Sequence, residues 1–150
     1  MSDESRDRIA DGIDAVEGAY EFFLAYAAQG ITEESNAGRV GTQLRGHLDR
    51  MTEAVSELAP ALETLLEEGD LVGGDELKAF GEVLRADTEN AGAVLSLIRS
   101  RASISSQLID NLNASVHVRT LLTDLFILDE VLKLGVDQGT APETSASAAS

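Results

Sequence analysis

Three carboxylates on one helix face and a distant histidine are the side chains in this sequence best placed for chemistry. Asp14, Glu17 and Glu21 are spaced by three and four residues, so a helix carries them on one face. If the next helix returns antiparallel, His47 comes level with Ala15, within about one turn of Asp14 and Glu17. Carboxylates and imidazoles that project between helices are how bundle proteins bind pairs of iron or manganese ions.

This metal-site hypothesis makes Glu17, Glu21 and His47 the ligands of a di-iron or other divalent-metal centre, with Tyr20 beside them. The protein would then be a ferritin-like store or an oxidoreductase. The Glu-x-x-His pairs of such bundles are missing, because glutamine and leucine stand four and three positions before His47. The alternative interpretation is a solvated acidic face and a histidine at the edge of the helix seam.

A surface for another protein is the second candidate site. Four of the six aromatic residues lie between Tyr20 and Tyr26, and Phe22 and Tyr26 form a second face beside the apolar seam of their helix. Residues 121–134 are also apolar on more than one face, as in a central helix or an oligomer contact. We predict a contact surface made of Tyr20, Phe22, Tyr26, Phe126 and Leu128. The alternative is that these side chains simply fill the core.

The charge and the missing motifs favour this second hypothesis. The sequence contains no phosphate-binding loop, dinucleotide fingerprint, zinc-protease motif or nucleophile elbow. We therefore expect a non-enzymatic protein without a cofactor, an assembly factor, adaptor or structural accessory that binds another protein and forms a homodimer. A formal net charge of −16 repels phosphate backbones and anionic lipids, so it argues against nucleic-acid and membrane binding and favours a basic partner.

Two features of composition bear on the compartment and on covalent chemistry. The chain has no cysteine, which excludes disulfides, thiolate metal sites and cysteine nucleophiles. Its charged start has no apolar run behind it, so we expect no secretory signal and a cytoplasmic location.

The clearest pattern in the chain predicts a long packed helix. From Ala37 to Leu65 small and apolar residues recur at alternating spacings of four and three, which is typical of a helix that packs along its length against other helices. These seam positions are Ala37, Gly41, Leu44, Leu48, Met51, Val55, Leu58, Leu62 and Leu65. We expect Thr32 to cap this helix at its start and Pro60 to kink it or to end and restart it.

Turn signals divide the rest of the chain. Gly30 suits the left-handed cap of the first helix, and the glycine-rich residues 69–74 separate the second helix from the third. No glycine or proline interrupts residues 93–134, yet one helix over residues 75–134 would be about 90 Å long. We therefore predict a turn near Arg101–Ser103, with a single continuous helix used in a dimer as the alternative.

These patterns predict an all-α protein, an elongated antiparallel four-helix bundle with coiled-coil-like packing. The expected helices lie near residues 3–29, 32–68, 75–100 and 103–134. One bundle domain is expected over residues 1–137. The small polar residues 138–150 are predicted to form a disordered tail.

Overall fold

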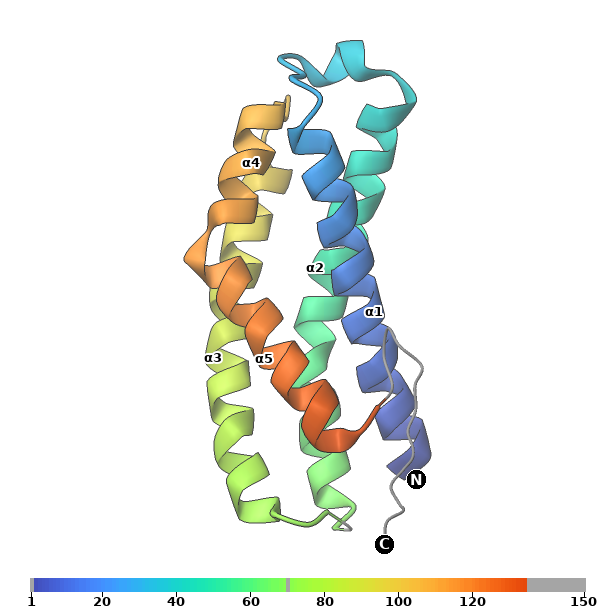
Figure 1. Ribbon diagram of the computed structural model, residues 1–150, viewed down its shortest axis with the longest axis vertical. Coiled ribbons are helices and arrows are strands. Elements are labelled where there is room, and N and C mark those ends of the chain that lie inside the picture. Colours follow the sequence, from blue (N-terminus) through green and yellow to red (C-terminus); the bar gives the residue numbers. More distant parts are fainter. Residues whose placement is uncertain (1, 70, 135–150) are drawn as a thin grey trace, which may run out of the picture.

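The protein is all-α in the computed structural model, which describes residues 2–69 and 71–134. These residues form no strand, and their helices are α1 (Ser2–Ala27), the short 3-10 helix η1 (Glu34–Ala37), α2 (Arg39–Glu67), α3 (Gly74–Arg99), α4 (Ser106–Ala114) and α5 (Val116–Leu132). Each pass of the chain along the molecule, which we call a column, runs opposite to the pass before it (Figure 1). The helices α4 and α5 together make the last column. The predicted all-α class is confirmed, but the described residues form five α-helices where four were expected. The predicted tail lies outside the described residues.

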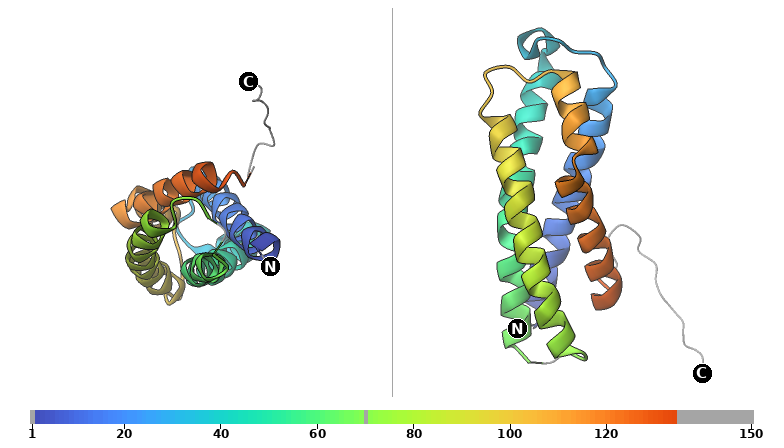
Figure 2. Two further views of the ribbon diagram at one scale, coloured as in Figure 1. Left: turned by 90° about the horizontal axis from the view of Figure 1, so that it is seen from below. Right: turned by 90° about the vertical axis from the view of Figure 1, so that its left-hand side faces the viewer.

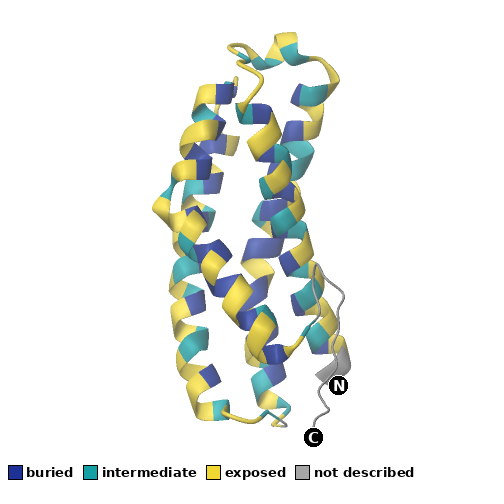
Figure 3. Cartoon of the chain, in the orientation of Figure 1, coloured by how far each residue is buried: buried dark blue, intermediate teal, exposed yellow. Residues whose placement is uncertain are grey.

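One apolar core runs along the inside of the columns. Seen from its end, the molecule has its helices arranged around a shared interior (Figure 2), and buried positions face inward along every column (Figure 3). From Gly41 to Leu65 every residue of the predicted seam of α2 is buried, while Ala37 is half-buried in η1. No helix in the described part of the chain is long and apolar enough to cross a membrane.

The second helix begins at Arg39, seven residues later than the sequence predicted. Gly38 has φ 63° and ψ −130°, a conformation that side chains with a Cβ rarely adopt, so the backbone changes direction there. Thr32 therefore caps no long helix, and residues 28–38 form a loop that contains η1. Gly30 has the predicted left-handed conformation, with φ +67°, although α1 itself ends three residues earlier, at Ala27.

Pro60 neither ends nor restarts α2, so that alternative is wrong, while the predicted kink stays a prediction. The helix continues through it to Glu67, although proline cannot donate the backbone hydrogen bond that the Ser56 carbonyl would otherwise accept. The positions on both sides, Ala59 and Ala61, are buried in the core. Tertiary packing of this segment therefore offsets the missing hydrogen bond.

The helical stretch after residue 74 is interrupted twice, and the sequence predicted one of these interruptions. The expected turn near 101–103 is the loop 100–105, and the Ser105 hydroxyl accepts the Leu108 N–H to begin α4. The second break is at Ser115, which is extended (φ −60°, ψ 130°) and accepts the His117 N–H with its hydroxyl. One serine side chain thus starts α5 without any glycine or proline.

Candidate protein-interaction groove

A groove runs between α1 and α5, where two of the predicted contact residues meet. α5 packs mainly against α3 and touches α1 over a shorter stretch. The groove between α1 and α5 has a volume of about 370 Å³. We call it the α1/α5 groove, and its lining residues are Glu17, Tyr20, Glu21, Arg119, Leu122, Thr123 and Phe126. Tyr20 and Phe126, about a hundred positions apart in the chain, therefore line one surface.

The groove combines an exposed aromatic ring with charged side chains. Phe126 is 52% exposed, which is unusual for a phenylalanine in a helix that buries its other apolar face. Tyr20 is half-buried beside it, and Glu17 and Glu21 come from the same helix as Tyr20. Arg119 is the basic side chain of the lining. Apolar rings bordered by charge are typical of surfaces that bind other proteins.

Two predicted contact residues, Tyr26 and Leu128, are buried in the core instead. Both are 0% exposed, so neither reaches a partner while the protein is folded. The Tyr26 hydroxyl donates to the Ile104 carbonyl at 2.6 Å, and burial together with the negative charge of Glu34 raises the pKa of Tyr26. This corrects the predicted contact surface, because the face of α1 that carries Tyr26 is an inner face.

The fifth residue of that prediction, Phe22, lies away from the groove. Its ring stacks on the His47 imidazole with centroids 4.3 Å apart and an interplanar angle of 22°. Phe22 and Tyr20 are two positions apart, about 200° around the helix axis, so they face different neighbours. Phe22 therefore fills the α1/α2 contact, and the structure does not bring it together with Phe126.

The predicted metal ligands are likewise divided between the α1/α5 groove and the contact of α1 with α2. Glu17 and Glu21 line the α1/α5 groove, whereas His47 lies under Phe22 with its Nδ1 3.2 Å from Nη2 of Arg50. Burial and the charge of Arg50 lower the pKa of His47. Within residues 2–69 and 71–134, no three acidic or histidine side chains form a group able to hold a metal ion. The three predicted ligands thus do not form one site.

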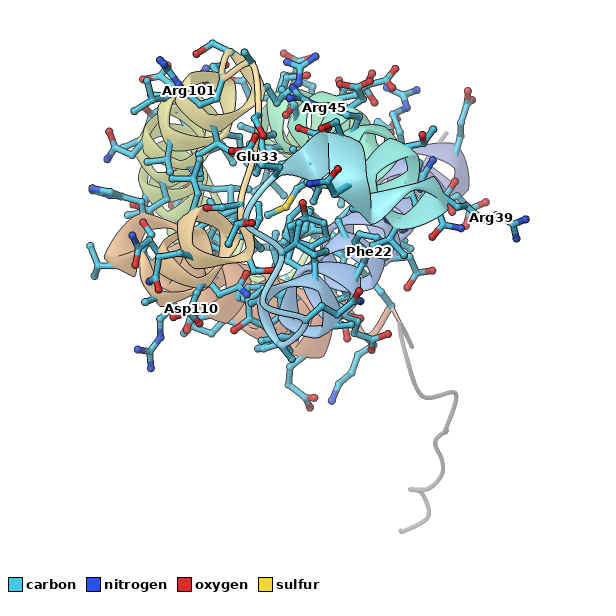
Figure 4. All side chains as sticks on the ribbon, turned by 90° about the horizontal axis from the view of Figure 1, so that it is seen from above. Phe22, Glu33, Arg39, Arg45, Arg101 and Asp110 are labelled. Atoms are coloured by element: carbon cyan, nitrogen blue, oxygen red, sulfur yellow. The ribbon has the colours of Figure 1, made fainter. Side chains whose placement is uncertain are left out.

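A polar network that the sequence did not reveal closes one end of the bundle. Arg45 of α2 binds both carboxylate oxygens of Glu34, at 2.8 and 2.7 Å, and also donates to the carbonyls of Arg99 and Arg101 at 2.8 Å. Glu34 in turn accepts the Ile104 N–H. Figure 4 shows Arg45 and Glu33 at this end beside the loop that carries Arg101. We call Glu34, Arg45 and their carbonyl partners the end network.

A second feature that the sequence analysis missed is a carboxyl pair between α3 and α5. Asp124 is 7% exposed, and burial and the neighbouring Asp87 raise the pKa of Asp124 to about 7. A signal was present in the sequence, since Asp124 lies three residues after Leu121 and four before Leu128, on an otherwise apolar helix face. An acid at such a position predicts a buried partner, but its identity depends on how α5 packs.

Comparison with protein families, with curated proteins and with solved structures finds no match to this chain. What the protein does must therefore be inferred from its own side chains. The α1/α5 groove is the surface that joins residues from distant parts of the chain around an exposed aromatic ring.

Proposed function

We propose that this protein is a non-enzymatic binding module whose α1/α5 groove receives a basic, amphipathic helical segment of another protein. The observation that carries the proposal is the half-exposed ring of Phe126, which lies in a concave surface together with Tyr20, Glu17 and Glu21. A helix that enters such a groove buries an apolar side chain against the two rings. Its role in the cell would be that of an assembly factor, adaptor or structural accessory.

The charge of the chain supports a basic occupant. With a formal net charge of −16, the protein attracts positively charged segments and repels acidic ones, which raises the association rate of a basic partner. Lysine or arginine side chains that flank the buried apolar residue would come close to the acids of the groove wall. The face of a tyrosine or phenylalanine ring also attracts a cation. Salt should therefore weaken the interaction.

A synthetic amphipathic peptide of leucine, phenylalanine and lysine tests this proposal. We expect it to shift the NMR signals of Tyr20, Leu122 and Phe126, and to bind about tenfold more weakly to the Phe126→Ser variant. The loss should arise because serine removes the ring that the peptide buries. Titration calorimetry at two salt concentrations gives the affinities. Because Phe126 is half-exposed, the substitution should change the free energy of unfolding by less than about 1 kcal/mol.

Ile127→Ser is the matched control, because Ile127 is 48% exposed on the same helix but does not line the groove. It should bind the peptide as the wild type does. Equal weakening by both variants, shifts confined to another face, or undiminished binding by Phe126→Ser would each overturn the proposed site.

The homodimer and the cytoplasmic location stay predictions. Sedimentation equilibrium tests whether the protein forms a homodimer. A dimer that Phe126→Ser dissociates would assign the groove to a second copy of this chain instead of a basic partner. The net charge of −16 on each copy opposes such an association at low salt.

A further inference from the structure

The carboxyl pair of Asp87 and Asp124 lies where α5 packs on α3. Asp124 is more than nine-tenths buried, and its Oδ2 atom has no hydrogen-bond donor in the described part of the chain. Asp87 is half-buried on the facing helix. Two ionised carboxylates only accept hydrogen bonds, so Asp87 and Asp124 can bond to each other only when one of the two carries a proton. Burial of an unpaired carboxylate is costly, and a like charge beside it adds to that cost.

Among the described residues, the charged neighbour that acts on Asp124 is another carboxyl and not a basic side chain. Asp87 is the charged group of α3 that acts on Asp124. α5 also packs on α1, which carries Glu17 and Glu21 in the α1/α5 groove, and on α4, which carries the exposed Asp110. Arg119, the basic residue of α5 nearest in sequence, lines that groove on the α1 side of the helix. Protonation is therefore the means by which the pair becomes neutral enough to stay buried.

The helix that carries Asp124 is joined to the rest of the molecule mainly through α3. The extended residue Ser115 separates α5 from α4. At its other end α5 stops at Lys133, which has φ 56°, and the Leu132 carbonyl accepts a hydrogen bond from Arg6. The outer side of α5 is open to solvent, with Phe126, Ile127 and Val131 about half exposed. Its packing on α3 is thus its main attachment.

We propose that Asp87 and Asp124 form a proton-operated latch, which holds α5 on α3 while the pair carries a proton and loosens α5 about Ser115 when both carboxyls ionise. This inference does not depend on the occupant of the α1/α5 groove, because it concerns the docking of α5 itself. If a partner does bind in the α1/α5 groove, loosening of α5 would also displace Phe126, which lines that groove.

Hydrogen–deuterium exchange of the full chain at pH 6 and pH 8.5 tests the latch. Burial beside Asp87 raises the pKa of Asp124 from 3.8 to about 7 when α5 is docked, so docking should weaken about tenfold over this interval. We expect protection factors, which correct for the intrinsic pH dependence of exchange, to fall about tenfold in α5. Those of α1 and α2 should change little.

Three variants make the test specific. Asp124→Asn and Asp87→Asn each replace one carboxyl by a neutral group of the same shape that can donate a hydrogen bond, so α5 should stay equally protected at both pH values. Either variant suffices if the other fails to fold, as checked by circular dichroism. Asp110→Asn removes one exposed charge on the neighbouring α4 and should behave like the wild type. Equal protection of wild-type α5 at both pH values, or an undiminished fall in both paired variants, would overturn the latch.

Discussion

Replacing Tyr26 with alanine should lower the free energy of unfolding by about 3–5 kcal/mol, the range typical of a buried aromatic residue. The ring is 0% exposed, and its hydroxyl is bound to the Ile104 carbonyl, so the substitution leaves both a cavity and an unpaired carbonyl. The Tyr26 carbonyl also accepts the Ser106 hydroxyl at 2.6 Å, which joins α1 to the start of α4. Urea unfolding followed by circular dichroism measures the loss.

Two further variants separate the contributions of the ring and the hydroxyl. Tyr26→Phe keeps the ring and removes only the hydrogen bond, so it should cost about 1–2 kcal/mol. Phe22→Ala removes a half-buried ring from the same helix and should cost less than Tyr26→Ala. If Tyr26→Ala proved as mild as Phe22→Ala, Tyr26 would belong to a surface, as the sequence had suggested.

Replacing Arg45 with alanine should lower the free energy of unfolding by about 2 kcal/mol at pH 7. The Arg45 guanidinium binds the Glu34 carboxylate, the Arg99 carbonyl at the end of α3 and the Arg101 carbonyl in the loop 100–105. The Glu34 side chain is only 15% exposed, so its charge would lose its partner in a partly desolvated position. Arg8→Ala is the control. Its ion pair with Glu4 joins side chains that are 49% and 75% exposed and should contribute less than about 0.5 kcal/mol.

The end network also predicts how the difference in unfolding free energy between the wild type and Arg45→Ala depends on pH. The hydrogen bond from Arg45 holds the pKa of Glu34 below its ordinary value of 4.5. A carboxyl whose pKa is lowered on folding stabilises the protein above its ordinary pKa, and the contribution is lost as the pH falls through the lowered value. Urea unfolding at pH 7 and at pH 3 should therefore show a smaller gap between wild type and Arg45→Ala at pH 3. A gap that does not shrink would mean that Arg45 stabilises the loop through its carbonyl contacts alone.

The candidate site was only partly predictable. Tyr20 and Phe126 were both predicted as contact residues, and they do line one groove. Tyr26 and Leu128 shared the same sequence signal, an aromatic or apolar residue outside the main seam, yet both are buried. The sequence shows that a helix has two apolar faces, but it does not show which of them is exposed to solvent. The positions of the neighbouring helices decide that. The register that placed His47 level with Ala15 was wrong, because residues 28–38 form a longer connection than the expected turn, and His47 lies opposite Phe22 instead.

Local features of the chain followed from the sequence by itself. The all-α class, the buried seam from Gly41 to Leu65 and the left-handed conformation of Gly30 depend on the helical period and on backbone preferences within a few residues. The tertiary structure decided the rest. Packing kept α2 helical through Pro60 and set Arg45 against Glu34, and the docking of α5 on α3 placed Asp124 beside Asp87. Burial and the pKa of a buried group depend on which distant segment lies opposite, and a helical period carries no information about that segment.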